Sequence, residues 1–453
     1  MGTAEVRIRE IGPSRSLGSG AVRALSGFAV ALLIGVLLLG TPLAAEDGEP
    51  TNLVDALFTG VSAICVTGLT VFDTSTHWSM FGEIVIITLV QLGGLGYMVG
   101  TGVLLWAAGR QMGLRDRQLL RLYYSAPSLG ETLAFVRNIA IYALALEAIG
   151  TVILFFAFLG EDYGVGEAGW QAGFHSISAF NNSGFNITGN DMIDFRANHT
   201  ITGTISVLVV LGGMGAIPVL AFVGCRSWGK LPLDAKIIFL MTGVILVLGT
   251  VVFAVFEWDD DETIGRENVE VRVLDSFFEV AMSRTAGFSV IPLDETRDQT
   301  KMLVAPLMFV GGAAGSTAGG IKIGTFALLL AAMLATVRGE PDAVLFRRKI
   351  PERMIRQALA ITIWGLLVTL AFILLMMALT DEVFVNVMFD SVSALGTVGM
   401  STGVPGRADA MARLAFTGAM LLGRFGPLVL LLQMNAPRRR STFRVPGDSI
   451  RLG

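Results

Sequence analysis

Four short segments of the chain repeat one pattern of residues, and this repetition constrains the fold more than any other feature. Each segment leads to a glycine that has Phe ten residues before it, Val or Ile seven before it and Ser or Ala six before it, and a large apolar residue directly after it. The glycines are Gly68, Gly184, Gly287 and Gly399, spaced by 116, 103 and 112 residues. Repetition at a nearly constant spacing indicates tandem copies of one supersecondary unit.

Long apolar runs indicate a polytopic helical membrane protein. Of the 453 residues, 53% are hydrophobic and only 15% are charged, against about 25% charged in soluble domains. Runs such as 24–39 and 84–108, taken with their flanks, are long enough to cross a hydrocarbon core of about 30 Å. The alternative, a large soluble α/β enzyme, should contain only short apolar runs.

Charged residues alternate in sign between the apolar runs. Basic clusters at 7–23, 110–121, 226–236, 338–356 and 438–451 alternate with acidic clusters at 46–49, 161–167, 259–270 and 381–382. The positive-inside rule places the basic set, with both termini, in the cytoplasm. The stretch 41–45 could pass for a signal-peptide cleavage site, but four equal units require an uncleaved first helix.

These observations predict an all-α membrane protein of four tandem helix–pore loop–helix units, with eight spanning helices around a pseudo-fourfold pore. The units are residues 1–109, 110–229, 230–340 and 341–453, and the second helix of the third unit is broken. The second helices are expected over 81–108, 201–224, 302–337 and 412–432. Asp55, Asp275 and Asp390 fall near the starts of three short re-entrant helices, where we expect them to act as N-caps. A negatively charged outer mouth is a compatible role for them.

The four loops have the properties expected of a cation filter. A dehydrated cation needs several oxygen ligands, which stacked rings of backbone carbonyls can supply, and glycine permits the unusual φ and ψ angles that this arrangement demands. The copy Thr397-Val398-Gly399 resembles the filter of potassium channels. The expected ligands are main-chain oxygens of Val66, Thr67, Gly68, Asn182, Ser183, Gly184, Thr285, Ala286, Gly287, Thr397, Val398 and Gly399. Amphipathic loops of an ordinary transporter are the alternative.

Arg284 is the unusual residue of the third loop. We expect it to anchor that loop by pairing with Glu279 or another carboxylate, and to stay out of the ion path.

A glycine-rich stretch interrupts the second helix of the third unit. Ten residues, 311–320, include no large side chain and cannot hold a regular helix well. Irregular backbone at membrane depth must be buried in protein or line a water-filled cavity. We therefore predict a mobile gating loop that contains Gly311, Gly312, Gly315, Ser316, Thr317, Gly319 and Gly320. A patch of close helix packing is the alternative.

Two cations lie within apolar segments. Lys322 follows the glycine-rich stretch, and Arg424 lies in the last helix. Burying a cation in the bilayer is costly, so such residues are functional candidates by default. We expect Arg424 to raise an electrostatic barrier below the filter and to hold the glycine-rich loop through its carbonyls. Lys322 could instead extend toward the cytoplasm.

Six segments together resemble the Trk/Ktr/HKT superfamily of potassium transporters, and most of all the bacterial Ktr-type membrane subunit. They are residues 62–70, 91–96, 178–185, 283–288, 314–322 and 423–427, and the resemblance covers nearly the whole chain. It implies filter glycines at Gly68, Gly184, Gly287 and Gly399, a gating loop at 311–320 and Arg424 beneath the filter. A Ser in place of the first filter glycine accompanies sodium selectivity in plant members, so Gly68 favours potassium.

The resemblance also implies partners and a location. It implies a homodimer with one pore in each protomer, placed in the plasma membrane, with a ring of nucleotide-binding regulatory subunits on the cytoplasmic face. The basic loops 115–121 and 338–356 would be docking surfaces, or else contact lipid headgroups. No nucleic-acid partner is expected.

We therefore expect a potassium-uptake subunit that is not an enzyme. It would carry potassium at the filter residues and hold no covalent cofactor, and its sodium dependence stays open. The alternatives are a secondary transporter of a small solute or of another monovalent cation. An intramembrane enzyme would need a catalytic constellation, whereas Glu83 and Glu147 are isolated carboxylates.

Overall fold

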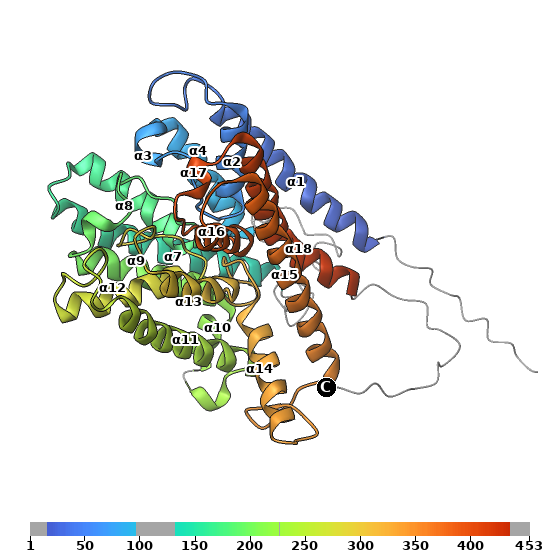
Figure 1. Cartoon of the computed structure of the whole chain (residues 1–453). Helices are drawn as coiled ribbons and strands as arrows, with labels where there is room; N and C mark the ends of the chain where they lie inside the picture. Colours follow the sequence, from blue (N-terminus) through green and yellow to red (C-terminus); the bar gives the residue numbers. More distant parts are fainter. Residues whose placement is uncertain (1–15, 97–131, 226, 435–453) are drawn as a thin grey trace, which may run out of the picture.

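The structure, a computed structural model, describes residues 16–96, 132–225 and 227–434, and this part of the chain is mostly helical (Figure 1). The predicted basic clusters at 110–121 and 438–451 and the expected helical residues 97–108 lie outside the described residues.

One order of elements recurs along the chain: a long helix, a short helix, a loop that contains one of the four glycines, and a second helix. In the first unit these elements are α1 (Ser16–Leu39), α2 (Leu53–Ile64), α3 (Thr74–His77) and α4 (Met80–Gly94). The second unit has α7 (Thr132–Leu159), α8 (Val165–Phe180), η1 (Ile193–Phe195), α9 (His199–Met214) and α10 (Ala216–Cys225).

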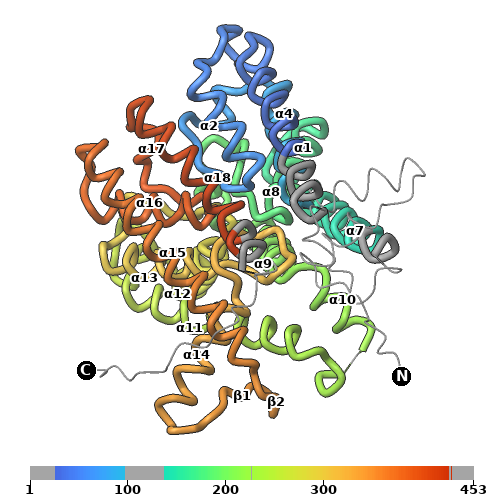
Figure 2. The backbone as a smooth tube through the Cα atoms, turned by 90° about the vertical axis from the view of Figure 1, so that its right-hand side faces the viewer, coloured from blue at the N-terminus to red at the C-terminus, as the bar shows by residue number. Residues whose placement is uncertain are grey.

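A short 3-10 helix, η2 (Trp228–Lys230), lies at the boundary between the second and third units. The third unit has α11 (Leu233–Glu257), α12 (Val269–Met282), α13 (Asp298–Phe309) and α14 (Ile323–Val337). The fourth begins with a two-stranded hairpin, β1 (Val344–Leu345) and β2 (Arg348–Lys349). It continues with α15 (Glu352–Leu379), α16 (Phe384–Gly396), α17 (Val404–Arg407) and α18 (Ala410–Met434). In Figure 2, α10, α14 and the hairpin project from the lower end of the molecule, opposite α2 and α17.

Within the described ranges, three helices are long and apolar enough to cross a membrane on their own: α7 from Arg137, α11 and α15. The bent pair α9 and α10 would make a fourth span if it crosses as one unit. Apolar side chains such as Ile149 of α7, Val251 of α11 and Leu370 of α15 are exposed, as a lipid-facing surface requires. The arrangement of eight spanning helices remains a prediction.

The second helix of the second unit, expected as one helix over 201–224, is sharply bent. Its two parts, α9 and α10, meet at an angle of 93° at Gly215. Gly215 has a φ of +76°, which L side chains adopt only at a cost, and Pro218 has no N–H to continue the helical ladder. The bend brings Gly215 against Gly315 and Ser316 of the glycine-rich stretch.

The expected N-cap role of the three aspartates is wrong. Asn52 caps α2 and Asn268 caps α12, whereas α16 has no side-chain cap. Asp55 instead pairs with Arg413 of α18 at 2.7 Å, and Asp275 pairs with Arg196, so both carboxylates join different units. Asp390 accepts hydrogen bonds from backbone N–H groups of the segment that follows the fourth loop.

The Phe of the repeated pattern anchors each short helix in the core. Phe58, Phe174 and Phe389 are fully buried, while Phe277 is half-buried. Two large hydrophobic clusters result, one mainly from the second and third units and one mainly from the first and fourth. The short helices are therefore fixed by packing, which places their C-terminal ends and the loops that follow.

Candidate functional site

All four loops adopt the same unusual backbone conformation. The glycines have φ angles of +85°, +76°, +80° and +102°, in the order Gly68, Gly184, Gly287 and Gly399. The residues two positions before them, which are Val66, Asn182, Thr285 and Thr397, also have positive φ, between +49° and +70°. Non-glycine residues rarely adopt this region. The units therefore share a backbone geometry that their differing side chains do not explain.

The four glycines face one another in a closed ring. A Cβ added to Gly184 would lie 2.6 Å from the carbonyl oxygen of Ala286, and one added to Gly287 would lie 2.7 Å from that of Val398. A Cβ on Gly68 would clash with the Ser183 carbonyl, and one on Gly399 would clash with the Thr67 carbonyl. Each loop thus abuts the next and the fourth abuts the first. The structure brings together all twelve predicted loop residues.

Hydroxyl groups of the short helices hold the loops. Ser62 Oγ donates to the Leu69 carbonyl and Ser178 Oγ donates to the Phe185 carbonyl, both at 2.7 Å. In the fourth unit Ser393 Oγ accepts from Gly399 N at 3.1 Å. The third unit has Ala281 at this position and lacks such a bond. The Ser in the repeated pattern therefore fixes the loop that follows it.

Buried carboxylates hold two of the outer segments that follow the loops. Glu279 accepts from Ser289 Oγ and Val290 N, both at 2.8 Å. Asp390 accepts from Ser401 Oγ and from Thr402 N and Val404 N.

The proposed pairing of Arg284 with Glu279 is therefore not made. Arg284 is 7% exposed, and its Nε has no hydrogen-bond partner among the described residues. Glu279 instead turns outward to the segment after its own loop.

A polar cavity of about 340 Å³ lies against the ring, on the side of the segments that follow the loop glycines. The four glycines line it, together with Thr70, Asp73, Thr74, Asn186, Asn190, Asp191 and Ser401. Asp191 accepts from Ser289 N and Asn186 Nδ2, both at 3.0 Å. Burial raises the pKa of Asp191 to about 8, while hydrogen bonds from Ser289 N and Met192 N act in the opposite direction. Sequence reasoning missed Asp191, which lies seven residues beyond Gly184.

The glycine-rich stretch 311–320 is irregular, as predicted, and lies between α13 and α14. It touches the second and fourth loops: Thr317 Oγ1 donates to Asn182 Oδ1 at 2.9 Å, and Gly319 packs so closely on Thr397 that a Cβ there would clash with its hydroxyl. Ala313 N donates to the Gly213 carbonyl at 2.9 Å, next to the bend at Gly215. The stretch therefore contacts the loops directly.

Two cations bind three consecutive carbonyls of this stretch. Arg424 Nη1 donates to the Thr317 carbonyl at 2.7 Å, and Lys322 Nζ donates to those of Ala318 at 2.6 Å and Gly319 at 3.4 Å. Arg424 Nη2 also donates to the Gly93 carbonyl at 3.0 Å. Arg424 therefore bonds to a carbonyl of the glycine-rich stretch, as expected. Lys322 also bonds to this stretch rather than extending away from it.

Sequence reasoning missed how the second helices close on the short helices. Gly93, Gly212 and Gly423 of the second helices each lie against a backbone carbonyl near the end of the short helix in the same unit. This carbonyl belongs to the residue four positions before the loop glycine, and an added Cβ on the second helix would clash with it. The signal was present as Gly-x-x-Gly at 93–96, 212–215, 312–315 and 423–426. In the third unit the equivalent Gly312 packs on the Gly213 carbonyl instead, because the helix is broken there.

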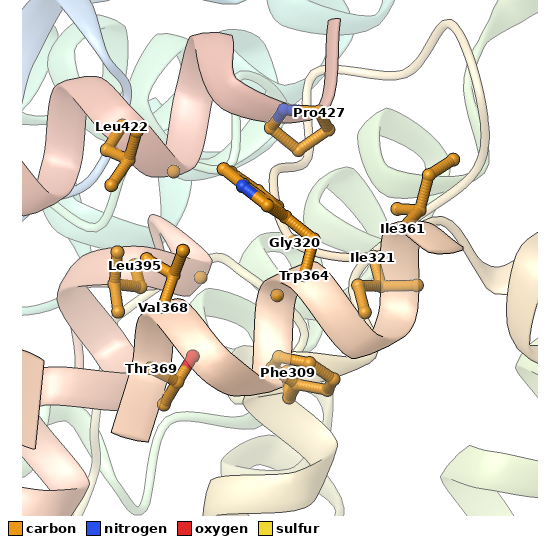
Figure 3. A pocket seen from close by; sticks show the side chains of 13 residues that line it. Phe309, Gly320, Ile321, Ile361, Trp364, Val368, Thr369, Leu395, Leu422 and Pro427 are labelled. Carbon is orange, nitrogen blue, oxygen red and sulfur yellow. The ribbon is translucent and has the colours of Figure 1, made fainter. Parts of the chain in front are cut away.

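A small apolar cavity of about 30 Å³ lies beside the end of the stretch (Figure 3). Gly320 and Ile321 line it from one side, and Trp364, Leu395 and Pro427 line it from α15, α16 and α18. Vacant space next to a segment reduces the packing that opposes its movement.

Comparison with known proteins identifies relatives over nearly the whole chain. The chain is 34% identical to Ktr system potassium uptake protein B of Vibrio alginolyticus over 440 residues, covering 95% of this chain and 94% of that protein. It is 30% identical to the Bacillus subtilis protein of the same name, covering 94% and 95%. It is also 30% identical to the potassium/sodium uptake protein NtpJ of Enterococcus hirae, covering 94% and 96%.

The crystal structure of the potassium transporter TrkH from Vibrio parahaemolyticus shares the fold, with a TM-score of 0.65 at 21% identity over 91% of this chain and 85% of that one. The TrkH cation transport protein family matches residues 34–441. The chain therefore belongs to the TrkH family of cation transport proteins.

Proposed function

We propose that this protein takes up potassium through a pore formed by its four loops. As a member of a cation transport protein family it is a membrane protein. The closed ring of four glycines carries the proposal, because each loop adopts the same strained backbone and abuts the next. Rings of backbone carbonyls at such a position can replace the hydration shell of a cation.

The proposed ion path runs from the outer polar cavity through the ring to the glycine-rich stretch. Potassium enters the cavity that Asp73 and Asp191 line and binds to main-chain oxygens of the twelve loop residues. The stretch 311–320 acts as the gate, because it lies against Asn182 and Thr397. Arg424 and Lys322 hold the gate closed through its carbonyls.

Transport of sodium is a second candidate. The relative from Enterococcus hirae is named a potassium/sodium uptake protein, and only the fourth loop has the Thr-Val-Gly residues of potassium channels. Potassium is favoured because all four loops keep the glycine.

We further propose that the protein works as a homodimer in the plasma membrane with cytoplasmic termini and a regulatory subunit ring. The two relatives named Ktr system potassium uptake protein B support this, since the name describes one part of a system. Exposed basic residues Arg347, Arg348 and Lys349 on the projecting hairpin offer a docking surface.

Growth of a bacterium that lacks its own potassium uptake systems tests the function. Expression of this chain, with and without a regulatory subunit, should restore growth at low potassium. Failure of both strains, with the protein present in the membrane, would contradict the proposal. Rescue that depends on added sodium would show sodium coupling.

A further inference from the structure

A buried carboxylate, Glu147, lies behind the second loop and is not part of the proposed ion path. It falls near the middle of α7, within the span Arg137–Leu159, and is 5% exposed. α7 packs against α8, the short helix that leads into the second loop. Ionisable residues at membrane depth are costly and are functional candidates by default.

The carboxylate is enclosed by side-chain amides. Gln91 Nε2 of α4 donates to both of its oxygens, at 3.1 Å and 3.0 Å, and Asn181 Nδ2 donates to Oε1 at 3.1 Å. Asn181 Nδ2 also bonds Gln91 Oε1 at 2.7 Å, so the three side chains form one network. Asn181 directly precedes Asn182, the loop residue that contacts Thr317 of the gate.

No cation pairs with Glu147 in the described ranges. On α18, Arg424 bonds the carbonyls of Gly93 and Thr317. On α8, His175 bonds Gln171 and Ile187, and on α4, Glu83 bonds Trp170.

The other titratable groups on the helices around Glu147 make contacts with groups other than its carboxylate. Cys65, the residue after α2, is a buried free thiol, and Tyr142 of α7 donates to the Leu211 carbonyl. His199 begins α9 at its outer end, next to the Arg196–Asp275 pair. A buried carboxylate without a cation is expected to take up a proton or bind an ion.

We propose that Glu147 is a proton-binding site linked to potassium binding in the loops, an inference that rests on the proposed function. Ionised Glu147 places a negative charge beside the second loop and favours a cation there. Protonation removes this charge and weakens potassium binding. By reciprocity, bound potassium opposes protonation to the same extent.

The hydrogen-bond network provides two states for this linkage. In the structure the carboxylate accepts three hydrogen bonds from amide N–H groups, which suits the ionised form. A protonated Glu147 becomes a donor at one oxygen, and Gln91, which now donates to both oxygens, accepts from it when its amide reverses. Asn181, which donates to Gln91 Oε1, must then change its own bonds. Asn181 carries this change to the second loop. Its Oδ1 is buried with no partner, so this oxygen can accept a new bond when the amide turns. The turn gives up the bond from Nδ2 to the Ile177 carbonyl, at 2.9 Å.

The test measures the potassium concentration for half-maximal uptake in proteoliposomes that hold the full chain, with equal pH on both sides. All variants carry Asp191→Asn, which removes a titratable group of the outer cavity. Between about pH 9 and about pH 5, a range that covers buried carboxyl groups, this concentration should rise about fivefold or more, as coupled sites typically show. Adding Glu147→Gln should give the high acid value at every pH.

Matched variants keep the result interpretable. Glu147→Asp should restore a pH response, and Glu83→Gln, at another buried carboxylate of the membrane region, should leave it intact. If Glu147→Gln does not fold, Gln91→Met removes two N–H bonds to the ionised form and should move the transition to higher pH. An unshifted transition would overturn the inference.

Three other outcomes would overturn the inference. An unchanged pH response in Glu147→Gln would exclude Glu147 as the proton site. A shift caused by sodium concentration rather than by pH, and lost in Glu147→Gln, would make the site a sodium site. Potassium uptake with no pH dependence would contradict the proton site but not the proposed function. No uptake at any pH would contradict both.

Discussion

At the scale of single residues, the backbone repeats while the side chains differ. Val66 and Asn182 differ from each other and from the threonines Thr285 and Thr397, yet all four residues have positive φ. This conformation costs about 1–2 kcal/mol for each non-glycine residue, and such strain persists where the surrounding structure enforces it. The hydrogen bonds from Ser62 and Ser178 and the packing of the buried phenylalanines supply this enforcement.

Gly68→Ser should reduce the preference for potassium over sodium by about tenfold, or about 1.4 kcal/mol. Gly68 has a φ of +85°, and an added Cβ would clash with the Ser183 carbonyl, so the ring must open there. Competition of sodium with rubidium uptake measures the change. Gly243→Ser in α11, where an added Cβ meets nothing within 4 Å, is the control. Unchanged selectivity in Gly68→Ser would remove this glycine from the filter.

Asp191→Asn should weaken potassium binding in alkaline solution and leave it nearly unchanged in acid. Because burial raises the pKa of Asp191 to about 8, the wild-type side chain is charged only above that pH and neutral well below it. The asparagine is neutral throughout, so the two proteins should differ above about pH 8. Half-saturation measured at acid and alkaline external pH tests this. An equal difference at both values would show that the charge is not responsible.

At the scale of elements, the broken helix of the third unit joins the other units at the centre. Its stretch 311–320 bonds Asn182 of the second loop and Arg424 of the last helix, and it packs on the bend at Gly215. An element held by contacts from several units can respond to all of them, as a gate requires.

Thr317→Val should increase potassium flux about fivefold. The change keeps the side-chain shape but removes the hydrogen bond to Asn182 Oδ1, which weakens the closed position by about 1 kcal/mol. Ser316→Ala is the matched control, because the Ser316 hydroxyl donates to the Ala313 carbonyl of the same stretch and not to a loop residue among those described. Equal flux in the two variants would exclude the Thr317 contact from gating.

Sequence patterns predicted the elements well where local rules decide them. The four short helices, their loops and the break at 311–320 follow from the repeated pattern and from glycine density. The bend at Gly215 was missed because Gly212, Gly213 and Gly215 lie in an apolar run that could equally well form one helix. The three aspartates were misassigned because their partners, such as Arg413 for Asp55, lie far away in the sequence. The Glu147 network is likewise tertiary, since it joins α4, α7 and α8.

At the scale of the whole molecule, ion pairs join units that are distant in the chain. Asp55 of the first unit bonds Arg413 of the fourth across 358 residues, and Arg196 of the second pairs with Asp275 of the third. The first of these contacts closes the circle of units that the ring of glycines also closes. Both pairs are largely buried.

Asp55→Asn should destabilise the fold by about 1.5–3 kcal/mol, the value of a hydrogen bond to a charged group. The change leaves Arg413 without its carboxylate partner, so the ion pair between the first and fourth units is lost. Thermal unfolding of the purified protein in detergent should show a lower midpoint. Glu352→Gln, which breaks the exposed Arg356 pair, is the control and should change little. Equal midpoints for both variants would contradict a role for Asp55 in joining the units.

The central claim is that the four loops of one chain form a potassium-selective pore. Its most direct test is cation flux into proteoliposomes that contain only this purified chain, with potassium and sodium compared under equal driving force. We expect potassium flux well above sodium flux in the wild type, with the difference reduced in Gly68→Ser and retained in Gly243→Ser. Equal entry of both ions in the wild type, or no entry of either, would contradict it.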